Sequence, residues 1–271
     1  MANEDSTKIK RIIIMIPKII HYTWFSGEDF PEKIKHCIDS WNEFLPDYEF
    51  RLWGAHSIKN IDSQFLTEAI KCKKWAYASD FVRLYAVYNF GGIYLDTDVM
   101  LYNDFDSVLD NKVFIGRENS IHFEGRRNEN YLTSHCFGAE KGNQYIKHCL
   151  DYYTDRHFEC SINNDLPNTL RFNMVLLPYI QCEIAKLYGF DSRPSQNKTQ
   201  YCKDGMVIYP ISYFDAPTTT KQTICRHLAM GSWREYRSQD ENATLSYKLR
   251  WRWERLVHRL LGSKYVIIRL N

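Results

Sequence analysis

Residues 79–98 read SDFVRLYAVYNFGGIYLDTD, and this stretch decides the fold class. Its first part continues an apolar pattern that predicts a mostly helical segment over residues 66–90. Gly91 and Gly92 follow, and glycine is common just past the end of a helix. The apolar residues 93–95 then predict a short buried strand that Asp96-Thr97-Asp98 closes. A helix feeding a strand with acidic residues at its carboxyl end is typical of an α/β sheet with a ligand site at that edge.

Asp96 and Asp98 are spaced two apart, so on a continuing strand both carboxylates would point to the same side. Two adjacent carboxylates repel each other unless a positive charge lies beside them. Mg²⁺ or Mn²⁺ prefers oxygen ligands and can hold a diphosphate as a leaving group. The tripeptide alone is a common pattern, and its alternative interpretation is two solvated carboxylates in a turn.

Asp80 and Arg83 are spaced i, i+3, so they share one face of the predicted helix and can pair. One interpretation is an ordinary ion pair, which contributes about 0–1 kcal/mol at a surface. The other is a polar pair that binds the hydroxyl groups of a sugar.

The remaining sequence extends the α/β pattern. A buried strand over 12–23, a helix over 31–45 beginning at Pro31 and a strand over 48–53 predict a parallel unit. Further strands are predicted at 113–116, 206–214 and 224–230, and helices near 142–156, 170–188 and 243–262. We expect one catalytic domain over 1–242 and a basic amphipathic tail over 243–271.

Composition excludes several classes of protein. The 271 residues carry 35 basic and 33 acidic side chains, a net charge of +2, which gives no reason to expect a nucleic-acid partner. The eight cysteines are scattered, with no Cys-x-x-Cys pair, so we expect free thiols, most of them buried, rather than disulfides or a zinc site. The apolar run Ile12–Ile20 is too short to span a bilayer and lacks a signal-peptide cleavage site, so we expect a cytoplasmic protein.

Two blocks of sequence carry a family resemblance. SDFVRLY at 79–85 and GGIYLDTD at 91–98 resemble the Asp-x-Asp glycosyltransferases of family 32. That family includes bacterial capsular-polysaccharide transferases and the yeast mannosyltransferase that starts outer-chain synthesis, and the same block is similar to the glucosyltransferase domains of large clostridial toxins. IPKIIHYTW at 16–24 and HLAMGSW at 227–233 agree with it, whereas residues 120–200 match only faintly.

The resemblance implies a GT-A fold, a twisted and mostly parallel sheet flanked by helices, and roles for individual residues. Catalytic roles fall on Arg83, Asp96 and Asp98. Donor contacts fall on a wider set: Trp24 on the base, Asp80 and Arg83 on sugar hydroxyls and phosphate, Tyr94 in the pocket wall, Asp96 on ribose and sugar, and Ser232 and Trp233 over the diphosphate. Asp98 and His227 would bind Mn²⁺ or Mg²⁺. The alternative for both tryptophans is core packing, and for His227 a structural hydrogen bond.

The implied activity is retaining hexosyl transfer from a UDP- or GDP-linked sugar to a glycan or lipid-linked acceptor, in surface or capsular polysaccharide synthesis. In a same-face mechanism the departing diphosphate oxygen takes the acceptor's proton, so we expect no separate general base. Acceptor contacts are expected within 120–200, where Pro167, Asn168, Thr169 and Asn173 are weak candidates.

The predicted tail helix has a basic stripe beside an apolar face. Residues 248–269 hold seven Lys or Arg and one acid, Glu254. This pattern suits peripheral contact of residues 245–262 with the anionic inner face of a membrane. The alternative is a helix packed on the domain with a solvated basic face.

Two other functions share parts of this pattern. A sugar-1-phosphate nucleotidyltransferase would need a glycine-rich basic loop after the first strand, and residues 24–29 read WFSGED instead. A non-catalytic carbohydrate-binding protein would tolerate a decayed site, whereas Asp80, Arg83, Asp96 and Asp98 are all present. No dinucleotide-binding, P-loop or serine-hydrolase motif occurs.

Overall fold

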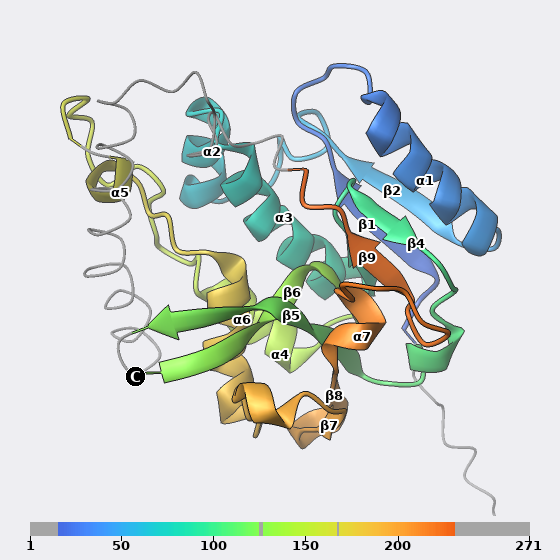
Figure 1. The fold of residues 1–271 in the computed structure, drawn as a ribbon. Helices are drawn as coiled ribbons and strands as arrows, with labels where there is room; N and C mark the ends of the chain where they lie inside the picture. The colour runs from blue at the N-terminus through green and yellow to red at the C-terminus, as the bar shows by residue number, and fades with distance from the viewer. Residues whose placement is uncertain (1–15, 125–126, 167, 231–271) are drawn as a thin grey trace, which may run out of the picture.

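The computed structural model describes residues 16–124, 127–166 and 168–230, and its centre is a seven-stranded sheet (Figure 1). The strand order is β2-β1-β3-β6-β5-β8-β7, and a two-stranded sheet, β4-β9, lies beside it. The strands of the large sheet are β1 (Ile19–Thr23), β2 (Glu49–Trp53), β3 (Gly92–Leu95), β5 (Val113–Glu124), β6 (Arg127–Ala139), β7 (Gln200–Tyr201) and β8 (Met206–Tyr209). The small sheet joins β4 (Val99–Leu101) to β9 (Cys225–His227).

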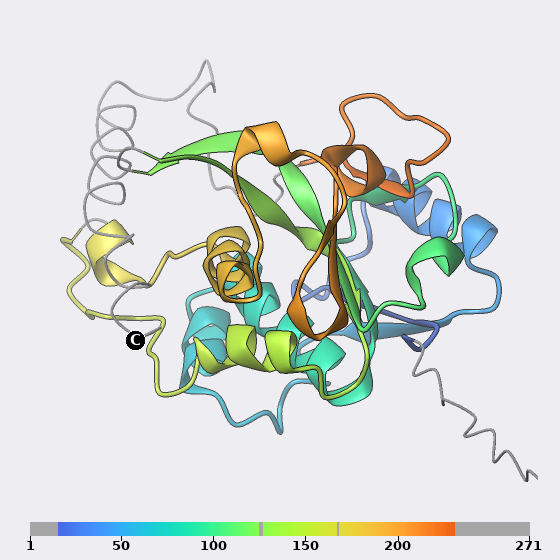
Figure 2. The same cartoon turned by 90° about the horizontal axis from the view of Figure 1, so that it is seen from below.

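Helices cover both faces of the large sheet (Figure 2). One face carries α3 (Trp75–Phe90), α4 (Gln144–Asp151) and α6 (Leu177–Leu187), with α2 (Gln64–Lys71) packed on α3. The other face carries α1 (Glu32–Phe44), the β4-β9 pair and the short α7 (Ile211–Phe214). A second short helix, α5 (Asn168–Arg171), lies near the edge of the first layer. Each layer has its own buried hydrophobic cluster, so the sheet packs against a separate hydrophobic core on each of its two faces.

The strand pairings confirm an α/β sheet flanked by helices. β1 runs parallel to β2 and β3, and β5 runs parallel to β8. β6 runs antiparallel to both β3 and β5, and β7 antiparallel to β8. The antiparallel β6 places its residue Cys136 opposite Leu95, at the end of β3 that leads into Asp96.

The structure corrects several predicted boundaries. The single helix expected over 66–90 is two helices, because Lys73 adopts a left-handed φ of 54° between them. Pro31 caps α1 rather than beginning it. The strand expected over 206–214 ends at Tyr209, and Pro210 caps α7 instead.

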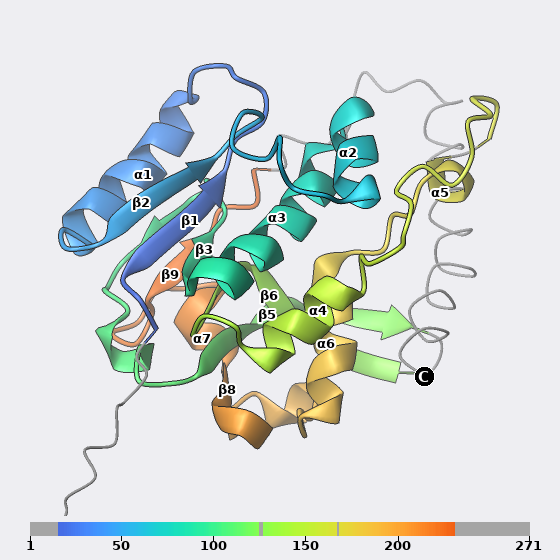
Figure 3. The same ribbon diagram turned by 180° about the vertical axis from the view of Figure 1, so that it is seen from behind.

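The largest difference lies in the faintly matching middle of the chain. β5 and β6 are long paired strands that pass behind α4 and α6 in Figure 3, where only a four-residue strand at 113–116 was predicted. Buried residues run almost without interruption from Asn130 to Ala139. A strand covered on both faces lacks the in–out alternation that marks a half-exposed strand.

All eight cysteines lie in the described part of the chain as free thiols. Five of them are buried, in line with the prediction for most of the thiols, whereas Cys160 is exposed. Among the described residues, no helix combines the length and the apolar character needed to cross a bilayer. Several predictions fall outside the described residues. They concern Ser232, Trp233, residues 12–15, the 242/243 boundary and the tail helix at 243–262.

Candidate active site

Arg83 is the buried polar centre of the site. It projects from α3 toward the carboxyl end of β3, and its side chain is only 4% exposed. The guanidinium Nη2 lies 3.2 Å from Asp80 Oδ1 and 3.2 Å from Asp96 Oδ1. Its Nη1 donates to the Ser134 carbonyl at 2.6 Å, and its Nε donates to the Ser79 carbonyl at 3.1 Å. The Arg83 side chain therefore connects both Asp80 and Asp96 to β6.

The ion pair of Asp80 and Arg83 lies in a strongly desolvated environment. Burial raises the pKa of Asp80 to about 7, although Arg83 beside it acts in the opposite direction. The backbone N–H of Leu177, at the start of α6, also donates to Asp80. Burial lowers the pKa of Arg83, but the surrounding Asp96, Tyr94 and Asp80 more than offset this and hold it above its ordinary value. Such a buried, hydrogen-bonded pair is a structural support of the site rather than an exposed surface ion pair.

Asp96 follows directly after β3 and is held from three sides. The hydroxyl of Tyr94 donates to Asp96 Oδ1 at 2.8 Å. The backbone N–H of Asp96 donates to the carbonyl of His135 at 2.9 Å, across the β3–β6 pair. Arg83 supplies the third contact and also lies 4.5 Å from the centre of the Tyr94 ring. The carboxylate is 24% exposed, so it is fixed in place while one side stays open.

Asp96 and Asp98 come together through a turn, not through a strand. The strand ends at Leu95, and the backbone N–H of Val99 donates to the Asp96 carbonyl at 3.0 Å. The same-side argument from strand periodicity was therefore wrong in its geometry. The two carboxylates converge because this tight turn leads straight into β4.

Asp98 meets His227, a residue 129 positions later in the chain. His227 Nε2 lies 3.1 Å from Asp98 Oδ1, and the backbone N–H of Met230 donates to Asp98 Oδ2 at 2.9 Å. β4 and β9 create this contact, since Val99 lies opposite His227 in the antiparallel register. Burial raises the pKa of Asp98, but the hydrogen bonds from His227 and Met230 outweigh it and lower the pKa overall.

The three side chains Asp96, Asp98 and His227 form a metal-binding arrangement, hereafter the acidic-histidine trio. Each offers one ligand atom, and these atoms all lie within 4.8 Å of one another. All three residues are partly exposed. Two carboxylate oxygens and one imidazole nitrogen are suitable ligands for Mn²⁺ or Mg²⁺ with open positions for substrate oxygens. The donor set thus fits the divalent ion expected from the sequence.

The structure places the remaining predicted residues as follows. Tyr94 is fully buried, and its hydroxyl also contacts Thr23 Oγ1 at 3.1 Å, which links β1 to the site. Trp24 follows β1 in a partly exposed position, where its indole N–H donates to the Glu28 carbonyl at 2.7 Å. Its contact with a nucleotide base stays a prediction.

The weak acceptor candidates have local structural partners. Asn168 begins α5, and Asn173 Oδ1 accepts a hydrogen bond from the Tyr152 hydroxyl at 3.3 Å. Pro167 lies outside the described residues, as does the side chain of Thr169. Their role in acceptor binding stays a prediction.

Sequence reasoning missed the contribution of β6. Ser134 accepts from Arg83 through its carbonyl, and His135 bonds to the Asp96 backbone and stacks on His227. Both residues lie in the segment that matches the family only faintly. The signal available was the run from Asn130 to Ala139, whose aromatic, β-branched and small residues suit a buried strand.

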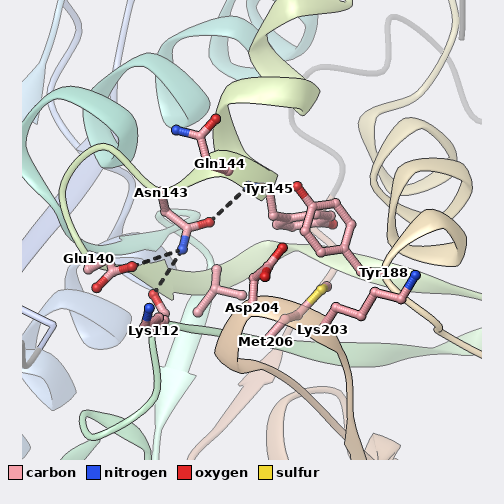
Figure 4. A pocket seen from close by; sticks show the side chains of 10 residues that line it. Lys112, Glu140, Asn143, Gln144, Tyr145, Tyr188, Lys203, Asp204 and Met206 are labelled. Atoms are coloured by element: carbon pink, nitrogen blue, oxygen red, sulfur yellow. Dashed lines mark hydrogen bonds between the residues drawn. The ribbon is translucent and has the colours of Figure 1, made fainter.

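A separate cavity of about 220 Å³ lies at the other end of the sheet (Figure 4). Lys112, Glu140, Asn143, Tyr188 and Lys203 are among the residues that line it. It adjoins the first residues of β5 and β8, whereas the trio follows the last residue of β3. The cavity is therefore distinct from the candidate active site.

Comparison with known proteins agrees with the geometry. Residues 31–115 match the family described as "Glycosyltransferase sugar-binding region containing DXD motif". Inositol phosphoceramide mannosyltransferase 3 of Schizosaccharomyces pombe is 37% identical over 110 residues, which cover 38% of this chain and 30% of that protein. Mannosyl phosphorylinositol ceramide synthase SUR1 of Saccharomyces cerevisiae is 29% identical over 111 residues, 40% of this chain and 29% of that protein. The chain thus spans about a third of the length of these curated relatives.

Solved structures of glycosyltransferases also overlap with the chain. The PaToxG glycosyltransferase has a TM-score of 0.46 at 19% identity, covering 64% of this chain and 70% of its own. The galactosyltransferase LgtC, solved with donor and acceptor sugar analogs, has a TM-score of 0.36 at 12% identity, covering 88% of this chain and 95% of its own. The sequence match over residues 31–115 includes Asp80, Arg83, Asp96 and Asp98. Residues 31–115 are therefore similar to the DXD-containing sugar-binding region of glycosyltransferases.

Proposed function

We propose that the chain is a metal-dependent, retaining glycosyltransferase that moves a hexose from a nucleotide-sugar to a glycan or lipid-linked acceptor. The observation that carries this proposal is the convergence of Asp96, Asp98 and His227 beside the buried Asp80–Arg83 pair. Two of these three residues lie in the matched sugar-binding region, and the fold brings the third to them.

The residues of the site would have different roles in binding the cation and the donor. Asp98 and His227 would hold the cation, with Asp96 beside them. A bound divalent cation supplies positive charge to offset the charge that develops on the diphosphate leaving group. Arg83 and Tyr94 would keep the Asp96 carboxylate in one orientation toward the donor, since both already bind it. In this same-face mechanism the departing diphosphate oxygen would accept the proton of the acceptor hydroxyl.

The names of the two yeast relatives suggest which substrates to test first. Two of them are named as enzymes that attach mannose to inositol phosphoceramides. GDP-mannose is therefore the first donor to test, followed by UDP-galactose and UDP-glucose. A lipid-linked or glycolipid acceptor fits the same names, and synthesis of a surface or capsular polysaccharide is the cellular role we infer.

The decisive experiment measures nucleoside diphosphate released from each donor by the full chain with Mn²⁺. We expect one donor to turn over, and Asp98→Asn to lower the rate by about 10²–10³-fold, the usual loss when one charge-stabilising group is removed. Asp110→Asn is the matched control, because Asp110 is an exposed aspartate shortly after the same turn. It should keep the wild-type rate.

Other outcomes would identify the alternatives. Formation of nucleoside triphosphate from donor plus pyrophosphate would indicate a nucleotidyltransferase. Donor binding without turnover under any divalent ion would indicate a carbohydrate-binding protein. Equal rates in Asp98→Asn and wild type would exclude the proposed metal site.

We further propose that the enzyme works in the cytoplasm at the inner membrane face. The basic amphipathic pattern of residues 245–262 and the lipid-linked acceptors named above support this placement. Anionic liposomes should pellet the full chain more than a truncation ending at residue 243. Equal pelleting would contradict the membrane contact.

A further inference from the structure

His135 touches two members of the acidic-histidine trio by two different routes. Its backbone carbonyl accepts the N–H of Asp96 at 2.9 Å, where β6 pairs with the end of β3. Its imidazole ring stacks on the ring of His227, with centroids 4.5 Å apart and planes 18° from parallel. His135 is therefore a physical link between residues 96 and 227, which are far apart in the chain.

The ring of His135 is itself held firmly. Its Nε2 lies 3.0 Å from the carbonyl of Phe214, the last residue of α7. A carbonyl only accepts, so Nε2 carries the proton and donates it. The side chain is buried, with an exposed fraction of only 4%. A buried ring that a hydrogen bond holds in one orientation is a rigid surface for its neighbour.

His227 needs such a support. It is the last residue of the three-residue strand β9, and its side chain is 27% exposed. Its ring nitrogen Nε2 bonds to Asp98, which is itself a ligand candidate. Without a second constraint the imidazole could rotate away whenever Asp98 turns toward a cation. The groups that orient a metal-binding histidine commonly change metal affinity by about 10–100-fold when removed.

We propose that His135 is a positioning residue of the metal site, whose stacked ring keeps His227 aimed at Asp98. This inference rests on the proposed metal site and adds a residue that does not itself join the trio. His135 lies outside the matched region 31–115. Its role follows from β6 pairing with β3 and from α7 reaching the back of the ring.

The test is the affinity of the full chain for Mn²⁺, measured as loss of the free-ion signal in electron paramagnetic resonance. His135→Ala removes the ring and should weaken Mn²⁺ binding by about 10–100-fold. His135→Phe keeps a flat ring for stacking and should recover most of that affinity. His135→Asn offers an N–H toward the Phe214 carbonyl without a ring, and should remain weak. Thermal unfolding without metal shows that each variant is folded.

His21→Ala is the matched control. His21 is also a fully buried histidine of the same sheet, bonded to the Gly91 carbonyl at 2.9 Å, but it makes no contact with the trio. It should destabilise the fold and leave Mn²⁺ affinity at the wild-type value. A merely structural role for His135 would make the two alanine variants behave alike.

Failure of the positioning role and failure of the metal site itself would give different results. If wild type binds Mn²⁺ and Asp98→Asn does not, but His135→Ala binds as wild type does, the positioning role is overturned and the metal site stands. If His135→Phe is as weak as His135→Ala, the stacked ring is not the cause. If wild type binds no Mn²⁺, the metal site and this inference fall together. Should His135→Ala not fold, the comparison of wild type with His135→Phe and His135→Asn decides the question.

Discussion

His21 shows how a single polar side chain can stabilise the strands that carry the site. It lies on β1 with its ring fully buried. Its Nε2 bonds to the Gly91 carbonyl at 2.9 Å, and its Nδ1 accepts the indole N–H of Trp53 at 3.2 Å. One neutral tautomer satisfies both contacts, because the carbonyl needs a donor and the indole needs an acceptor. The ring thereby ties β1 to β2 and to the residue before β3.

This arrangement predicts a loss of stability in acid. Burial lowers the pKa of His21 from 6.5 to about 4. The unfolded chain therefore binds the proton first, so the stabilisation is complete above about pH 6.5 and is lost as the pH falls toward 4. The free energy of unfolding should decrease by up to about 3 kcal/mol across this range from His21 alone. Urea unfolding of wild type and His21→Gln at several pH values checks this, and parallel curves for the two proteins would contradict it.

At the scale of elements, the step from α3 into β3 depends on two consecutive glycines. Gly91 has φ of 69° and Gly92 has φ of 100°, both on the side of the Ramachandran map that residues with a Cβ avoid. A Cβ at Gly92 would lie 2.6 Å from the Ile19 carbonyl oxygen, in the parallel β1–β3 pair. The glycine pair lets the chain reverse tightly enough to place Asp96 beside Arg83.

Gly92→Ala should therefore destabilise the protein much more than an ordinary glycine substitution. Gly142→Ala is the matched control, since Gly142 has φ of 74° but nothing within 4 Å of the added Cβ. The control should lose about 1–3 kcal/mol from backbone strain alone. Gly92→Ala should lose more, because the carbonyl clash adds to the strain. Chemical denaturation measures both, and equal losses would show that the clash is relieved elsewhere.

At the scale of the whole molecule, the site exists only because two distant segments pair. β4 begins one residue after Asp98, and β9 ends on His227. Their pairing places the histidine against the acidic turn, while α3 approaches the same turn from the other layer. Both hydrophobic cores therefore contribute to one polar site at the edge of the shared sheet.

This architecture predicts a local response to metal. Mn²⁺ bound by the trio should slow amide hydrogen exchange in β4 and β9, because opening of either strand would break the site. Stabilisation grows with free metal, reaching about 2.7 kcal/mol at one hundred times Kd. The stabilisation by Mn²⁺ should vanish in His227→Ala. Unchanged exchange in both strands of the wild type at saturating Mn²⁺ would contradict this coupling.

The sequence determined the local parts of this protein. Short-range structure is specified by Gly91 and Gly92, by the apolar run before Asp96, and by the i, i+3 spacing of Asp80 and Arg83. Residues 31–115 carry enough pattern to match the DXD-containing sugar-binding family. These features depend on neighbours within a few residues, where steric and hydrogen-bonding preferences act directly. The predicted helix and strand of this stretch accordingly agree with the structure apart from the break at Lys73.

Only the tertiary structure decided how the distant residues meet. Because β6 is buried on both faces, its sequence lacks the alternation of apolar and polar residues that marks a strand. Neither the β5–β6 hairpin nor the position of His135 could therefore be predicted from the sequence. Asp96 and Asp98 converge through a turn, and His227 joins them through a three-residue strand too short to carry a periodic signal. The physical reason is that strand pairing and ring stacking depend on separation in space, which a linear pattern of residues does not encode.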